Sequence, residues 1–190
     1  MQILPAKKEH AHLIGKAVTM AIGDEITRNL AGESHCADDV EKLFTALAGR
    51  DDTQYSYRNT LVAQTADGQV AGLAVAYDGA GLITMRRIFF SEAADRIGLT
   101  VDGNIDDIAP ETTPDEFYLD TLAVFAEYRG QGIARQLLKA TKKRADAIGK
   151  PLGLLVDKTN VNARRLYDSA GFVKKDERPF AGEIMDHLIM

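Results

Sequence analysis

Two glycines between an apolar stretch and an amphipathic stretch constrain the fold of this chain more than any other feature. The segment reads Tyr128-Arg129-Gly130-Gln131-Gly132-Ile133-Ala134-Arg135. Its N–H groups fall where a helix begins, and the first N–H groups of a helix have no partner within that helix. The helix dipole adds positive potential there, which suits a pyrophosphate. The sequence therefore predicts a strand, a phosphate-binding turn and a helix, with a plain tight turn as the alternative.

The charge around this turn also favours an anion. Seven basic residues and one acidic residue lie between positions 128 and 150, whereas the whole chain has a net charge of −5. For Lys142 and Lys143, a solvated helix face is the alternative. The turn lacks the lysine and hydroxyl residue of a nucleoside-triphosphatase loop and the third glycine of a dinucleotide-binding loop. Those two classes of nucleotide site are excluded.

Composition sets broader limits. A chain of 190 residues with 45% hydrophobic residues is expected to form one domain, 1–190. The negative net charge argues against a nucleic-acid or membrane partner. The single cysteine, Cys36, excludes an internal disulfide and fits a reducing compartment. With no leader segment or membrane-length apolar run apparent, we expect a cytoplasmic protein. The four histidines are not spaced as a metal site demands, so none is expected.

Periodicity and turn residues predict the order of the elements. Strands are expected at 2–5, 60–64, 70–77, 116–125, 152–157, 172–175 and 183–190. Helices are expected at 6–21, 24–30, 38–48, 91–97, 133–148 and 162–170. This order implies a mixed sheet flanked by helices. Residues 79–114 are interpreted as an insertion that covers one side of the sheet.

The strand at 116–125 has an unusual pattern. Phe117 and Leu119 fall on one face by simple alternation, whereas Leu122 and Val124 fall on the other. Either both faces are buried, or a bulge near 120–122 switches the register.

Two blocks resemble the GNAT superfamily of N-acetyltransferases. Arg129-Gly130-Gln131-Gly132-Ile133-Ala134 matches its Arg/Gln-x-x-Gly-x-Gly/Ala signature, and the strand Leu119-Asp120-Thr121-Leu122-Ala123-Val124 precedes it. Asn160-x-x-Ala163-x-x-Leu166-Tyr167-x-x-x-Gly171-Phe172 is similar to the second block. The resemblance covers 116–174, and 79–114 departs from the usual short connection. It implies an α/β (α+β) fold with a mostly antiparallel sheet of about seven strands and a splayed central strand pair.

The resemblance also implies a cofactor, acetyl-CoA, and the residues that hold it. Backbone N–H groups of Gln131, Gly132, Ile133 and Ala134 would bind the pyrophosphate, and Gly130 and Gly132 would permit its close approach. Arg129 and Arg135 would add charge-assisted contacts. Leu122, Ala123 and Val124 lie on the strand whose backbone would pair with the pantetheine arm. Asn160 would orient that arm, or it would only cap a helix.

The catalytic residues are also implied by resemblance. Tyr167 is the expected general acid, because the departing thiolate needs a proton; packing beside the cofactor is the alternative. Asp120 is the better candidate for the base, although it could merely satisfy backbone donors at a bulge. Tyr118 lies on the same side of the pleated strand as Asp120 and is expected to contact the substrate. Glu25 could bind a cationic amine, or it is an exposed loop carboxylate.

The sequence leaves the acceptor and the assembly open. An N-acetyltransferase would act on a primary amine of a small molecule or on a protein amino group. A non-catalytic acyl-CoA-binding module is the competing hypothesis, and the presence of Tyr167 favours the enzyme. A homodimer is common among similar proteins. His187 in the last strand is expected to be structural.

Overall fold

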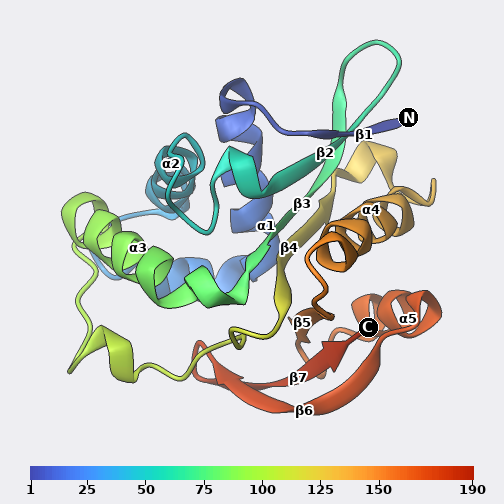
Figure 1. The fold of residues 1–190 in the computed structure, drawn as a ribbon. Coiled ribbons are helices and arrows are strands. Elements are labelled where there is room, and N and C mark those ends of the chain that lie inside the picture. The colour runs from blue at the N-terminus through green and yellow to red at the C-terminus, as the bar shows by residue number, and fades with distance from the viewer.

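Seven strands form one mixed sheet in the computed structural model, which describes residues 1–190 (Figure 1). The strand order is β1-β2-β3-β4-β5-β7-β6, and only the β4–β5 pair is parallel. The strands are β1 (Gln2–Pro5), β2 (Thr60–Gln64), β3 (Val70–Asp78), β4 (Phe117–Val124), β5 (Leu152–Val156), β6 (Val173–Phe180) and β7 (Glu183–Ile189). The predicted mixed, mostly antiparallel sheet is therefore confirmed.

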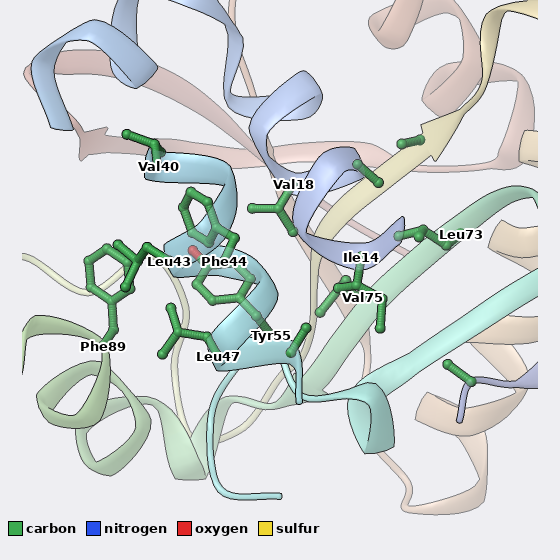
Figure 2. Packing of buried hydrophobic residues seen from close by; sticks show 14 of the residues in the cluster. Ile14, Val18, Val40, Leu43, Phe44, Leu47, Tyr55, Leu73, Val75 and Phe89 are labelled. Atoms are coloured by element: carbon green, nitrogen blue, oxygen red, sulfur yellow. The ribbon is translucent and has the colours of Figure 1, made fainter. Parts of the chain in front are cut away.

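Five α-helices cover the two faces of this sheet (Figure 1). They are α1 (Ala11–Ala31), α2 (Ala37–Ala48), α3 (Leu82–Ile97), α4 (Ile133–Ala147) and α5 (Val161–Ala170). The first core cluster joins α1, α2 and α3 to one face, and Figure 2 shows Val18 of α1 near Phe44 of α2 and Ile14 of α1 beside Val75 of β3. The second cluster joins α4 to the other face. None of the helices is long and apolar enough to cross a bilayer.

The two central strands separate soon after they pair. Strands β4 and β5 are in register only at Phe117↔Leu152 and Tyr118↔Gly153. Between β3 and β4 the register shifts by one residue, because Val75 faces Thr121 while Ala76 faces Leu119. Asp120 is therefore the extra residue of a β-bulge. Of the two alternatives for this strand, the register shift shows the bulge, and the predicted splay of the central pair is confirmed.

Helix α1 is divided by a glycine, as the two predicted segments 6–21 and 24–30 require. Gly23 has φ +78° and ψ +173°, which interrupts the helical backbone. A residue with a side chain would be strained at this φ, whereas glycine adopts it without strain. The helix resumes at once and continues to Ala31, and its second half turns away from the first.

Two predicted elements were too short. Helix α3 begins at Leu82, nine residues before the predicted start, and its buried face includes Arg86. A buried arginine breaks the apolar periodicity by which such a helix is recognised. Strand β6 extends to Phe180, although prediction ended it at residue 175. Its side chains are mostly exposed and polar, so only the pairing with β7 identifies it as a strand.

Candidate active site

The glycine turn before α4 offers a run of free N–H groups. The N–H groups of residues 130–135 have no hydrogen-bond acceptor in the protein, and the first helical bond runs from Gln136 N to Gly132 O at 3.3 Å. Gly130 and Gly132 have φ values of +77° and +73°, where side chains are strained. A Cβ atom at either glycine would meet nothing within 4 Å. The turn thus presents donors to open space, which fits a pyrophosphate.

These donors border a cavity of about 290 Å³. Several of the predicted cofactor residues line it together: Val124, Arg129, Gly130, Gly132, Ile133, Ala134 and Arg135. Tyr128 and Leu166 complete the lining, and sequence reasoning assigned them no contact. Gln131, Leu122 and Ala123 are not part of the lining. The cavity joins the end of β4 to the start of α4 and to α5.

The two arginines of the turn are already anchored. The Nε atom of Arg129 donates to the carbonyl of Val124 at 3.2 Å, which ties the turn to the end of β4. The Nη2 atom of Arg135 donates to the Ser169 hydroxyl at 2.8 Å, which ties α4 to α5. Both guanidinium groups still border the cavity. They add positive charge beside the free N–H groups.

Asn160 caps the start of α5, and Tyr167 lies within the helix, three residues before its end. The side-chain oxygen of Asn160 accepts from the N–H of Ala163 at 3.0 Å, which is the helix-capping alternative. Tyr167 is partly buried, and its ring packs edge-on against Phe172 with centroids 5.5 Å apart. Burial raises the pKa of Tyr167 to about 12. Its hydroxyl therefore stays protonated at neutral pH and can act as a donor.

Asp120 sits at the bulge, two residues beyond Tyr118, the last residue of β4 that pairs with β5. Its Oδ1 atom accepts from the Thr121 hydroxyl at 2.9 Å, and its Oδ2 atom lies 3.5 Å from the Tyr77 hydroxyl. Burial, and after it the negative charge of Glu111, raises the pKa of Asp120 to about 7. A carboxyl group with this pKa can accept a proton at neutral pH.

Three residues beside Asp120 were not identified from sequence. The Tyr77 hydroxyl also lies 3.4 Å from Glu111 Oε1, so it spans the two carboxylates. Arg86 forms an ion pair with Glu111 and donates to the carbonyl of Ile108 at 2.6 Å. Tyr77, Arg86 and Glu111 come from β3, α3 and the following link, and no local pattern relates them. The one sequence signal for Arg86 and Glu111 is the insertion interpreted at 79–114, which contains both.

The two predicted substrate-binding residues differ in their surroundings. Glu25 is exposed, and its helical neighbours Ile22 and Ile26 line a second cavity, of about 410 Å³, that Glu25 does not reach. Tyr118 is buried, and its ring packs against Tyr77 with centroids 5.7 Å apart. Burial holds the pKa of Tyr118 well above its ordinary value. Its ring packs against Tyr77, whose hydroxyl lies 3.5 Å from Asp120.

His187 lies inside the sheet, as expected for a structural residue. Its Nδ1 atom is 2.9 Å from Asp176 and its Nε2 atom is 3.2 Å from Glu116. The imidazole is fully buried between these two carboxylates. It therefore links β7 to β6 and to the residue that precedes β4.

Comparisons with known proteins find acetyltransferases among the chains similar to this one. The alignment with the uncharacterized N-acetyltransferase YycN of Bacillus subtilis is 35% identical over 68 residues, which is 35% of this chain and 44% of that protein. The chain thus matches less than half of that relative's length. A crystal structure of an acetyltransferase is 32% identical, covers 100% of this chain and 98% of its own, and superposes with a TM-score of 0.75.

The fold similarity extends further. The N-acetyltransferase from Staphylococcus aureus Mu50 has a TM-score of 0.80 at 24% identity, with full coverage of both chains. A family profile, the acetyltransferase (GNAT) domain, matches residues 85–190, which is more than half of the chain. This protein therefore belongs to the GNAT acetyltransferase family.

Proposed function

We propose that the protein transfers the acetyl group of acetyl-CoA to a primary amine. The observation that carries this proposal is the run of free N–H groups at residues 130–135, which opens on a cavity beside the splayed end of β4. A pyrophosphate would satisfy these donors, and Arg129 and Arg135 would complement its charge. The unpaired edge of β4 beyond Tyr118 leaves room for an extended arm between the central strands.

The reaction needs one proton taken from the amine and one given to the leaving group. When bound, acetyl-CoA supplies a thioester whose C–S bond breaks as the C–N bond to the amine forms. Asp120 accepts the proton that leaves the amine, directly or through a water molecule. The Tyr167 hydroxyl donates its proton to the departing sulfur and regains one from solvent. The products are an amide and a free thiol, so atoms and charge balance.

The pKa values suit these two roles. Asp120, with its pKa raised to about 7, exchanges a proton near neutrality, whereas Tyr167, with its pKa raised to about 12, keeps its proton until the transfer. Asn160 caps α5 with its side-chain oxygen and has its amide nitrogen available for the cofactor arm. Asp120 and Tyr167 would thus transfer protons, and Asn160 would position the cofactor.

A calorimetric titration with acetyl-CoA tests the donor site. We expect binding by the native chain and a loss of at least about 100-fold in affinity for Gly132→Glu, since a carboxylate would enter the phosphate cavity. Gly68→Glu is the matched control, because Gly68 also has a positive φ of +87° and open space around it. Equal loss in both variants, or no binding by the native chain, would contradict the proposal.

A screen of primary amines with thiol detection tests the reaction itself. Release of one thiol for each amide formed supports an enzyme. Persistent binding of acetyl-CoA without turnover on any amine would favour a non-catalytic acyl-CoA-binding module instead.

A further inference from the structure

The larger cavity, of about 410 Å³, has the character of a small-molecule pocket. Its volume lies near the lower end of the range for such pockets, about 300–1,000 Å³. Eleven of its sixteen lining residues are hydrophobic. They come from α1, α2, α3, the segments that follow α2 and α3, and the end of β6 with its turn into β7. Phe44 and Phe89 form part of the aromatic wall, and Figure 2 shows both with Tyr55 at the edge of the first core cluster.

Polar groups in this cavity are few and buried. Gln54, Arg86 and Glu111 line it with 5%, 4% and 6% of their surfaces exposed. The Oε1 atom of Gln54 is buried without a hydrogen-bond partner. A buried acceptor without a donor is unfavourable, so a ligand that donates to it gains an interaction that the protein alone lacks. The Glu111 carboxylate offers a second acceptor on the same lining.

The charged groups around Glu111, at one end of the cavity, can accommodate one more cation. Glu111 and Asp120 are joined through the Tyr77 hydroxyl, and Arg86 is the guanidinium paired with Glu111. Arg178 donates to the backbone carbonyl of Glu111, but its charge is paired with Asp176 and Glu116. Arg86 is paired with Glu111, so the negative charge that Asp120 gains when it loses its proton has no cation beside it. A single ammonium group would neutralise it.

We propose that the acceptor is a small monoamine with an apolar aliphatic or aromatic body, held in this cavity with its ammonium group at Glu111 and Gln54. The inference rests on the proposed acetyl transfer and specifies its acceptor. Tyr77 then connects the amine's binding site to Asp120. The ammonium group first releases one proton along this path to Asp120, which passes it to solvent. The resulting neutral amine then attacks the thioester and loses its second proton to Asp120, as in the proposed acetyl transfer. The hydrophobic lining binds the carbon skeleton and gives no partner to further charges.

This chemistry excludes two other kinds of acceptor. A polyamine would place a second ammonium group against an apolar wall or beside Arg86, where it has no counter-charge. A peptide amino terminus would bring backbone amides against the same wall, where Phe44, Phe89 and Phe90 provide no hydrogen-bond partner. The free monoamine has neither problem.

The test compares two amines that differ only in apolar length. Hexylamine has four more methylene groups than ethylamine, so its kcat/KM should be about 100-fold higher if the cavity buries the chain. Spermidine and a tripeptide that begins with leucine are the other two acceptors. Calorimetric titrations with hexylamine and with ethylamine, both without acetyl-CoA, measure the preference for hexylamine independently of turnover.

Two variants locate the effect. Ile26→Trp fills the cavity from α1 and should abolish the preference for hexylamine, whereas Ile83→Trp, on an exposed position of α3, should keep it. Gln54→Leu removes the free acceptor and should weaken hexylamine binding about tenfold while acetyl-CoA affinity is unchanged. Gln54→Leu tests the site even if the tryptophan of Ile26→Trp disturbs the fold.

The outcomes separate this inference from the proposed function. If acetyl-CoA binds and spermidine, the tripeptide or ethylamine is as good an acceptor as hexylamine, the monoamine assignment is overturned and acetyl transfer stands. An unchanged preference for hexylamine in Ile26→Trp would also overturn it. Failure of the native chain to bind acetyl-CoA, with hexylamine still bound, would instead remove the proposed function.

Discussion

Tyr167 combines a partly buried ring with a hydroxyl that keeps its proton. Because burial raises its pKa to about 12, the phenol can donate to a thiolate but does not ionise at neutral pH. We expect Tyr167→Phe to lower kcat about 100-fold and to leave the acetyl-CoA dissociation constant nearly unchanged. Steady-state kinetics and calorimetry measure the two quantities. Tyr57→Phe, at a hydroxyl that accepts from Arg58 Nε and lies outside the residues that line either cavity, is the control. An unchanged kcat would remove Tyr167 from the mechanism.

Asp120 should govern the pH dependence of the reaction. Burial and the charge of Glu111 raise its pKa to about 7, so the carboxylate that accepts a proton prevails only above that pH. We expect kcat/KM to rise with pH and to bend near pH 7. In Asp120→Asn this bend should disappear and the rate should fall about 100-fold. A bend that persists in the variant would assign it to another group.

The same residue affects stability in the opposite sense to a paired carboxylate. Asp120 holds its proton more tightly in the folded chain than in the unfolded chain, whose carboxyl titrates near 3.8. The stabilising contribution of Asp120 to the free energy of unfolding is therefore present at low pH and is lost as pH rises through about 7. Asp120→Asn should gain about 2–4 kcal/mol in unfolding free energy, relative to the native chain, between pH 4 and pH 8. Urea titrations at several pH values measure this difference.

Helix α1 depends on a close contact with α2. A Cβ atom at Gly15 would lie 2.7 Å from the backbone nitrogen of Thr45 and 2.9 Å from the backbone oxygen of Glu41. Alanine favours helices by about 1 kcal/mol over glycine, yet this contact forces the two helices apart. We expect Gly15→Ala to lower the unfolding free energy by about 1–3 kcal/mol.

The control for this prediction is Gly81→Ala. There the new Cβ atom would meet only the flexible end of Met85 at 3.2 Å. Chemical denaturation should show little change for this variant. A stabilised Gly15→Ala protein would mean that helix propensity outweighs the contact between α1 and α2.

The β4–β5 splay leaves the two halves of the sheet joined through few backbone bonds. The His187 cluster with Glu116 and Asp176 reinforces the closed end of this splay, because it connects β7 and β6 to the start of β4. Burial, against the opposing pull of Glu116, lowers the pKa of His187. The ion pairs with Lys175, His187 and Arg178 outweigh burial and lower the pKa of Glu116. Both groups therefore bind protons more weakly in the folded chain.

This cluster should make the whole molecule sensitive to acid. A lowered folded pKa gives stability that is present above the unfolded value and lost as pH falls below it. For His187 the loss begins below about pH 6.5, and for Glu116 below about pH 4.5. Thermal unfolding at each pH measures this dependence of stability on pH. His187→Gln should remove the loss of stability that begins below about pH 6.5 and should leave the loss that begins below about pH 4.5. A loss that still begins below about pH 6.5 in the variant would contradict the role of His187.

The sequence by itself determined the elements whose signals are local. Glycines at 130 and 132, the amphipathic α4 and the broken alternation at Asp120 predicted the phosphate turn, its helix and the bulge, because each depends on a few consecutive residues. Tertiary structure alone decided the rest. It brought Glu111 and Arg86 to Tyr77 and Asp120, set the full length of α3 and β6, and closed the apolar cavity. These features depend on contacts between distant residues, and a buried arginine or a polar edge strand leaves no periodic pattern in the chain.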